Sequence, residues 1–265
     1  GRAGPPADGR RSAVVGWPAP HPAAAPRRWH DAAVTARVIA APGPELDAVY
    51  RRLLVPSFPA RELIGLDDLA SGVRRGSVVV LVPATPGAPV AVAVGERFGP
   101  PEVVLLSYLA VDPAHRGRGA GGVLLDDAVA AWRGSAVLVL AEVEHPFTAP
   151  TTDARGDPRR RLAFYGRHGA RVLDLPFLQP ELRPGAGRVE GMLLLALHVD
   201  AAQTTSEGNL RAEPVQAFLA EYFRRAEGPV PVDPAARILL DRAGGRAGVR
   251  LLDPGDVGAL PGSPP

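Results

Sequence analysis

Apolar residues follow two spacings along the chain, one typical of strands and one typical of helices. Short runs rich in Val, Leu and Ala predict strands over residues 33–41, 77–82, 90–94, 103–111, 136–143, 171–175 and 192–199. Apolar positions three and four residues apart predict helices over residues 45–54, 61–73, 119–132, 158–168 and 213–227. The order strand, helix, strand over residues 103–143 is typical of a parallel crossover, which predicts an α/β protein.

The two ends of the chain differ in composition from its middle. Residues 1–32 mix Pro, Ala, Arg and Gly without apolar periodicity, so we expect a disordered lead. Residues 228–265 return to Pro and Gly and are expected to form a tail. Between them, a domain over residues 33–200 should be followed by an amphipathic helix within 201–227. Its apolar stripe should either dock on the domain or form a homodimer surface.

The residue composition removes several classes of chemistry. The chain has no Cys, and its 30 basic residues are all Arg. A thiolate metal site, a cysteine nucleophile, a P-loop lysine and a Schiff base are therefore excluded. The six His residues show no ligand spacing, so we expect no metal site.

Charge and hydropathy limit the partners. The formal net charge is +2, but the surplus of Arg lies in residues 1–32, and the rest of the chain is close to neutral. We therefore expect no nucleic-acid partner. No apolar run approaches the about 20 residues that span a bilayer, and residues 1–32 lack the apolar stretch of a secretory signal. These patterns predict a protein without a membrane partner, located in the cytoplasm.

A cluster of glycines lies between the strand predicted over 103–111 and the helix predicted over 119–132. It reads Arg116-Gly117-Arg118-Gly119-Ala120-Gly121. The free N–H groups and the positive dipole end of a helix favour an anion, and glycines let a pyrophosphate approach the backbone closely. Such a turn can bind phosphate without Lys. Alternatively, the glycines have a purely structural role and only permit a tight connection between the strand and the helix.

The same cluster admits a second interpretation. Residues 117–122 satisfy G-x-G-x-x-G, and Glu142 follows 20 residues later at the end of the next predicted strand, as in dinucleotide-binding folds. This would make the chain an NAD(P)-binding enzyme with Glu142 on the ribose. Five residues separate the strand from the first glycine, and no repeated strand–helix units follow, which counts against this alternative.

The segment from Leu109 to Gly121 resembles the acetyl-CoA motif of the Gcn5-related N-acetyltransferase (GNAT) superfamily. In that family Arg/Gln-x-x-Gly-x-Gly/Ala follows a strand that ends in a Val-x-Pro-like turn, as Val111-Asp112-Pro113 does here. The resemblance implies a mixed, twisted sheet of six or seven strands, splayed at the acetyl-CoA site, with helices on both faces. It also implies that the main chain of Leu109, Ala110 and Val111 pairs with the pantetheine arm. The turn amides of Arg116, Gly117, Arg118, Gly119, Ala120 and Gly121 would hold the pyrophosphate.

Acetyl transfer to an amine needs a base for the amine and an acid for the departing thiolate. The resemblance points to Tyr165 as the acid, because it occupies the Tyr of the family's Phe-Tyr-x-x-x-Gly helix. The protein-lysine acetyltransferases of the family carry a Glu on the motif strand, but Leu105 stands at that position here. We therefore expect Glu142 or Glu144, two residues apart on the next strand, to act as the base. Alternatively, His145 is the base, or both glutamates are a solvated strand end or pair with the Arg residues at 159–161.

Together these features predict an acetyl-CoA-dependent N-acetyltransferase that acts on the amine of a small molecule by direct attack in a ternary complex. Without Cys, a cysteine-linked acetyl-enzyme is impossible. The acceptor is expected on the side lined by the first two helices and the loop that contains Phe177 and Glu181. A different class remains open: a GNAT-like domain that binds acyl-CoA as a sensor or interaction module without turnover.

Overall fold

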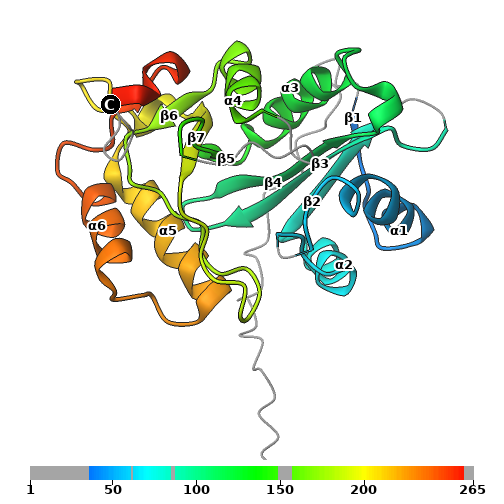
Figure 1. Cartoon of the computed structure of the whole chain (residues 1–265), viewed down its shortest axis with the longest axis horizontal. Coiled ribbons are helices and arrows are strands. Elements are labelled where there is room, and N and C mark those ends of the chain that lie inside the picture. The colour runs from blue at the N-terminus through cyan, green and yellow to red at the C-terminus, as the bar shows by residue number, and fades with distance from the viewer. Residues whose placement is uncertain (1–35, 61, 85–86, 149–156, 260–265) are drawn as a thin grey trace, which may run out of the picture. The chain divides into compact units, whose positions relative to one another are not determined.

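The computed structural model describes residues 36–60, 62–84, 87–148 and 157–259, which lie in one unit that spans Val34–Pro265. The lead predicted over residues 1–32 lies outside the described residues. One eight-stranded sheet has the order β1-β2-β3-β4-β5-β7-β6-β8 (Figure 1). The strands are β1 (Ala36–Val38), β2 (Val78–Pro83), β3 (Ala91–Phe98), β4 (Val103–Val111), β5 (Leu138–Glu144), β6 (Arg171–Leu173), β7 (Met192–Val199) and β8 (Leu251–Leu252).

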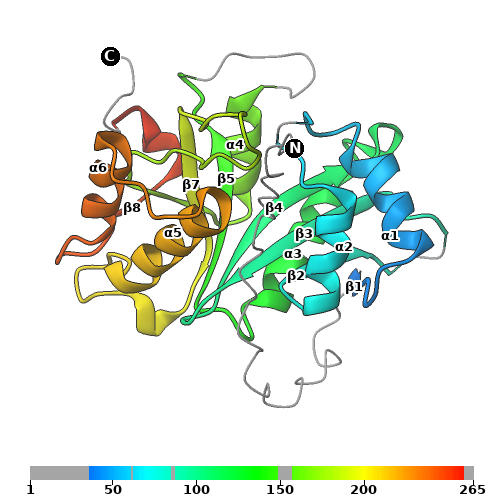
Figure 2. The ribbon, with the colours of Figure 1, turned by 90° about the horizontal axis from the view of Figure 1, so that it is seen from below.

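Six helices cover the two faces of the sheet. They are α1 (Pro44–Val49), continued by a π-helical turn (Tyr50–Leu54), α2 (Leu66–Arg75), α3 (Ala120–Trp132), α4 (Pro158–Arg167), α5 (Ala212–Glu227) and α6 (Pro234–Ala243). Helices α3 and α4 lie on one face, and the others lie on the opposite face, with α1 and α2 over one half and α5 and α6 over the other (Figures 1 and 2). The predicted GNAT-like mixed sheet is confirmed, with one strand more than the six or seven expected.

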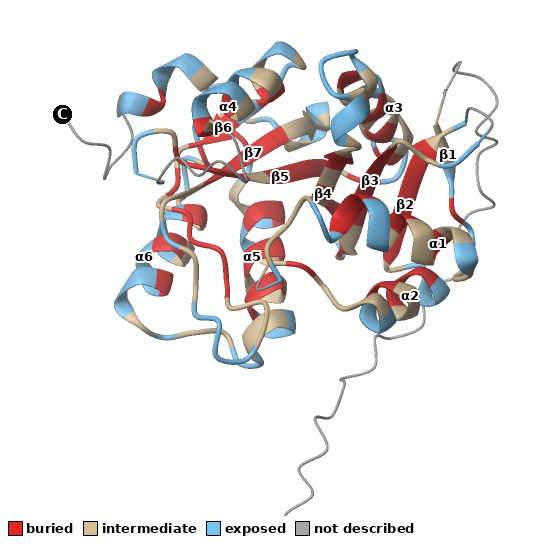
Figure 3. Cartoon of the chain, turned by 45° about the vertical axis from the view of Figure 1, so that its right-hand side comes forward, coloured by how far each residue is buried: buried red, intermediate tan, exposed pale blue. Residues whose placement is uncertain are grey.

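The period-two apolar pattern of the strands separates the core into these layers. Val139, Ala141 and Val143 of β5 pack with α3 and α4, whereas Leu138 and Leu140 pack with α5 and α6. A third cluster packs α1 and α2 against β2, β3 and β4, on the same face of the sheet as α5 and α6. Strands are therefore buried on both sides (Figure 3), as a sheet between two helical layers requires.

A β-bulge interrupts the pairing of β3 with β4. Val94 pairs with Tyr108 but Gly95 pairs with Leu106, which leaves Ser107 as the extra residue. A bulge shifts the alternation of the strand by one residue. Accordingly Val104 and Leu106 face α3, whereas Tyr108 and the residues after it reverse this parity, so Tyr108 faces α1 and α2.

Gly95, beside this bulge, has the buried ring of Trp132 directly against it. A Cβ at Gly95 would lie 2.6 Å from Cζ2 of Trp132, a side chain that is only 1% exposed. We expect Gly95→Ala to lower the free energy of unfolding by about 2 kcal/mol, since overpacking a dense core is destabilising. Urea unfolding measures this, with Gly255→Ala as control, because nothing lies within 4 Å of a Cβ there. Equal midpoints for the two variants would contradict the packing argument.

The C-terminal region corrects the prediction of a tail over 228–265. Asp233 caps α6 by accepting from the N–H of Ala236, and Pro234 occupies the first turn. Ala236, Leu239 and Ala243 are buried against the α5 side of the sheet. Strand β8 pairs with β6 and extends the sheet. The Pro- and Gly-rich composition concealed a capped helix whose apolar residues fall three and four positions apart.

The apolar stripe of α5 is docked on the sheet rather than left open for a dimer. Val215, Phe218, Leu219, Tyr222 and Phe223 are all buried within the chain. The stripe therefore gives no support to the homodimer surface that the sequence left open. No helix in the described parts of the chain is long and apolar enough to cross a membrane.

Candidate functional site

The glycine turn begins α3 with two left-handed residues. Gly117 has φ 74°, and Gly119, the N-cap residue of α3, has φ 84°. Only glycine adopts this conformation readily. Within the described residues, the N–H groups of residues 117–121 have no backbone acceptor, whereas those of Gly122 and Val123 bond to the carbonyl of Gly119. The turn therefore presents free donors at the positive end of a 13-residue helix.

The sheet opens directly beside this turn. Strands β4 and β5 pair in parallel from Val103↔Leu138 to Leu106↔Ala141, and among the described residues no pairing follows beyond that point. In this part of the chain, the edge of β4 over residues 107–111 therefore has no strand on its β5 side. Leu109, Ala110 and Val111 lie on this open stretch, as the predicted splay requires. The guanidinium of Arg116 folds back and donates from Nε to the carbonyl of Val111 at 3.0 Å, which joins the turn to the strand end.

A pocket of about 480 Å³ lies on the face opposite α3, between the two helical halves. Its strand residues are Glu96, Phe98 and Tyr108, and its walls come from residues 63–65, Asp68 of α2, the loop at 182–184 and the end of α5. The volume suits a small molecule. The prediction placed the acceptor between the first two helices and the loop after β6, and the pocket adds α5, which the sequence did not indicate.

Tyr108 shapes the wall before α2. Its hydroxyl accepts from the N–H of Ile64 at 2.9 Å and donates to the carbonyl of Glu62 at 3.0 Å. Backbone groups that a helix would use are thus bound to a side chain. For this reason α2 begins at Leu66, not at 61 as the apolar spacing predicted.

Glu142 projects from β5 toward α5, into the region beside this pocket. Its Oε2 accepts from Nε2 of Gln179 at 2.6 Å, while its Oε1 is buried and has no hydrogen-bond partner in the described part of the chain. Burial raises the pKa of Glu142 to about 7 and outweighs the polar side chains of Gln179 and Tyr222, which act to lower this pKa. Tyr222 also lines the pocket, so it connects Glu142 with that space. A carboxyl with this pKa is suited to proton transfer near neutral pH.

Glu144 has a different environment from Glu142, although both were predicted to border one cleft. Its carboxylate pairs with the guanidinium of Arg161 on α4. The ion pair assigns Glu144 to the strand end near α4, close to the alternative in which the glutamates pair with basic residues. His145 lies next to it with an imidazole pKa lowered by burial, and its Nδ1 accepts from the N–H of Phe147 at 3.2 Å.

Tyr165 lies on α4, one turn after Arg161, within the core cluster on the α3 side of the sheet. It is 7% exposed, and burial raises the pKa of its phenol to about 12, with the charge of Arg161 lowering it. The phenol therefore stays protonated at neutral pH, which an acid requires. Glu144, Arg161 and Tyr165 thus come together at the end of β5.

Glu96 is a carboxylate that the sequence did not single out. It stands on β3 directly across from Leu105, the position where a glutamate was expected on the motif strand. It accepts a hydrogen bond from Oγ of Ser107, the bulge residue, at 2.6 Å. Glu96 lines the pocket, and the hydroxyl of Ser107 holds its carboxylate there. Little in the sequence marked it, because Glu96 lies beyond the strand predicted over 90–94 and next to a second charged residue, Arg97.

A splayed mixed sheet with a glycine turn of free N–H groups at its opening is typical of a GNAT fold, not of a dinucleotide-binding one. Only β4 and β5 are parallel in the described sheet, whereas doubly wound folds are mainly parallel. Glu142, the residue expected to bind the ribose, instead accepts a hydrogen bond from Gln179 on the face opposite α3. Both the sheet and the position of Glu142 therefore show that the NAD(P) interpretation is wrong. Residues 47–150 match the sequence profile of the Acetyltransferase (GNAT) family. The chain therefore contains a domain of the GNAT superfamily.

Known relatives agree with this assignment. The chain is 31% identical to mycothiol acetyltransferase of Clavibacter sepedonicus over 188 aligned residues. The alignment covers 67% of this chain and 57% of the relative. The chain is 30% identical to mycothiol acetyltransferase of Clavibacter michiganensis subsp. michiganensis, covering 67% and 56%. The chain therefore spans less than two thirds of either relative. A solved GNAT-family structure from Bacteroides thetaiotaomicron superposes with a TM-score of 0.51 at 24% identity, over 67% of this chain and 89% of that one.

Proposed function

We propose that this chain is an acetyl-CoA-dependent N-acetyltransferase that transfers an acetyl group to the amine of a small molecule. The observation that carries the proposal is the turn with two left-handed glycines. Its free N–H groups lie beside an open strand edge and are suited to bind an anion. Pyrophosphate would bind the turn, and the amide-like pantetheine arm would pair with residues 109–111. The acetyltransferase names of the curated relatives support the same activity. The predicted cytoplasmic location belongs to this proposal.

The proposed reaction is a direct attack within a ternary complex. The acceptor occupies the pocket at Glu96 and Tyr108, and Glu142 takes the proton that the amine must lose before it attacks. The amine nitrogen forms a bond to the thioester carbon, and the bond from that carbon to sulfur breaks. Tyr165 gives its proton to the departing thiolate of CoA. The acetylated nitrogen loses its second proton to solvent, and Tyr165 regains a proton from solvent. Glu144, paired with Arg161, is the second candidate for the base.

Release of free CoA thiol in the presence of a panel of primary amines tests the proposal. We expect Tyr165→Phe to lower kcat by about 10²-fold or more, since proton transfer by a positioned acid contributes that much. The affinity for acetyl-CoA, measured by calorimetry, should not change. This pair of results separates catalysis from a sensor that binds acyl-CoA without turnover. Acetyl-CoA binding by the wild type without thiol release for any amine would favour the sensor.

A further inference from the structure

We infer that the acceptor is an α-amino acid or a similar small amine that carries a carboxylate, with Arg183 as the residue that recognises the carboxylate. This inference rests on the proposed function, because it names the substrate class of the same pocket. It is carried by the positions of the charged groups that line the pocket.

The strand side of the pocket is acidic. Glu96 lines it directly, held by the hydroxyl of Ser107, and Glu142 lies behind Tyr222. The two carboxyl groups project from the same face of neighbouring parts of the sheet. An ammonium group is the natural partner of such a region, and the amine must lie there to be deprotonated and acetylated.

The loop side of the pocket carries the opposite charge. Arg183 is half-buried at this wall, and its guanidinium donates to the backbone carbonyl of Leu63. It forms no ion pair with a carboxylate of the described residues. The other Arg of the wall, Arg225, pairs with Glu221 and stacks on the ring of Phe98. Arg183 therefore has donors that match the planar, bidentate geometry of a carboxylate.

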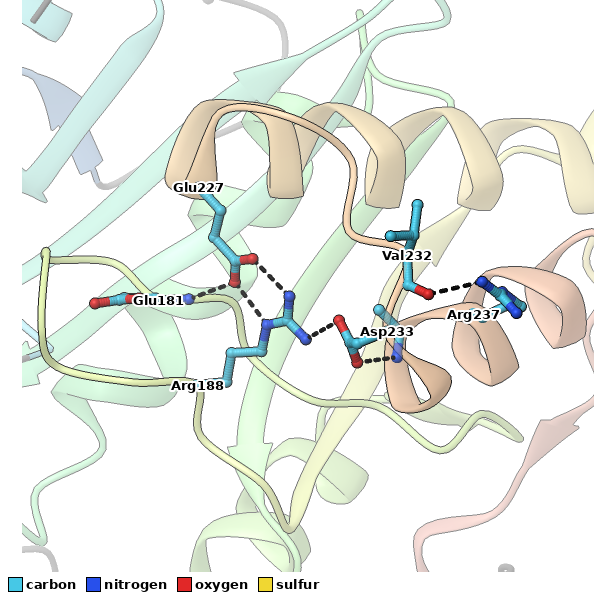
Figure 4. A network of polar contacts seen from close by, with 7 residues as sticks. Glu181, Arg188, Glu227, Val232, Asp233 and Arg237 are labelled. Carbon is cyan, nitrogen blue, oxygen red and sulfur yellow. Dashed lines mark hydrogen bonds and ion pairs between the residues drawn. The ribbon is translucent and has the colours of Figure 1, made fainter.

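The loop that presents Arg183 is fixed to the C-terminal helices (Figure 4). Arg188 binds Glu227 through two hydrogen bonds of 2.8 and 2.7 Å and binds Asp233 at 2.6 Å. Glu227 also accepts from the N–H of Glu181 at 3.0 Å. At the base of the loop, Gln179 pairs with Val189 in an isolated β-bridge and holds Glu142 by its side chain. A fixed loop keeps Arg183 in place before the ligand arrives, which favours specific recognition.

Most of the other lining residues are apolar, namely Leu63, Ile64, Phe98 and Leu182. Asp68 of α2 is the exception and adds a carboxylate to the wall beside residues 63–65. An amine near Glu96, a carboxylate at Arg183 and an apolar body between these walls together describe an amino acid with an apolar side chain. L-Phenylalanine and phenethylamine form a matched pair of probes, because they differ by the carboxylate alone and both are cationic at the nitrogen at pH 7.

The experiment measures binding of both probes in the presence of CoA, and acetylation of both with acetyl-CoA, for wild type and Arg183→Gln. We expect wild type to bind phenylalanine at least 10-fold more tightly than phenethylamine, and Arg183→Gln to remove this preference. Arg183→Lys should restore part of it, and the KM for acetyl-CoA should stay unchanged. Arg250→Gln, which removes an Arg paired with Asp174 at the surface, controls for net charge.

The outcomes separate the two proposals. Preferential binding of phenylalanine that depends on Arg183, without acetylation of any amine, would support the inference and reject the proposed function. Acetylation of amines with equal affinity for both probes would support the function and overturn the inference. A raised KM for acetyl-CoA in Arg183→Gln, with acceptor preference unchanged, would assign Arg183 to the cofactor and also overturn it.

Discussion

Replacing Gly119 with Val should lower the affinity for acetyl-CoA by about 100-fold or more, while the protein remains folded. A branched side chain at φ 84° is strained by about 1–3 kcal/mol, so the turn should leave this conformation. The free N–H groups of the turn would then no longer converge on one anion. Each hydrogen bond to a charged group contributes about 1.5–3 kcal/mol, so losing two of them accounts for the expected change. Calorimetric titration with acetyl-CoA measures it.

Gly208→Val is the matched control for this variant. Gly208 has φ 81°, and at both positions nothing lies within 4 Å of the place that a Cβ would occupy, so the backbone strain is comparable and neither variant creates a clash. Gly208 lies in the turn that follows β7 and precedes α5, away from the opening of the sheet. Acetyl-pantetheine, which lacks the pyrophosphate, should bind Gly119→Val as well as it binds wild type. Unchanged acetyl-CoA affinity in Gly119→Val would reject the turn as the cofactor site.

The part of the site that depends on local sequence could be predicted. A strand, a glycine turn and a helix are consecutive in the chain, so the position of Gly119 at the N-terminus of α3 follows from residues 103–132 alone. The parallel pairing of β4 with β5 follows from the short crossover between them. These elements need no information about the remainder of the chain.

The acceptor pocket could not be predicted in the same way, because its walls come from distant segments. Glu96 of β3 is held there by Ser107, the extra residue of a bulge in β4 that no residue pattern marked. Tyr222 belongs to an apolar stripe, and the stripe gave no sign that one of its members borders a ligand space. Glu142 and Glu144 have the spacing of one strand face, yet each is bound by a different long-range partner, Gln179 or Arg161. Tertiary contacts, not spacing, decide which carboxyl can titrate near neutral pH.

Glu142→Gln should lower kcat/KM by about 10²–10⁴-fold, because it removes the group proposed to deprotonate the amine. In wild type, kcat/KM should rise with pH until Glu142 has lost its proton and level off above its pKa of about 7. Since only the carboxylate can accept a proton, the rising limb belongs to the base. The variant should lack this limb. An acceptor whose amine titrates well above the tested pH range keeps the two ionisations apart.

Glu142→Gln should lower activity but raise stability, and the stability measurement tests the environment of Glu142 without any substrate. Its pKa is about 7 in the folded chain against 4.5 for the ordinary side chain. Between these values the unfolded chain releases the proton while the folded chain keeps it, so this group makes the wild type less stable as pH rises. Glu142→Gln should therefore gain about 1–3 kcal/mol over wild type at pH 8 and nothing near pH 4, by urea unfolding. Glu144→Gln, which breaks the pair with Arg161, should show neither this gain nor the loss of the rising limb. The reverse result would transfer the role of the base from Glu142 to Glu144.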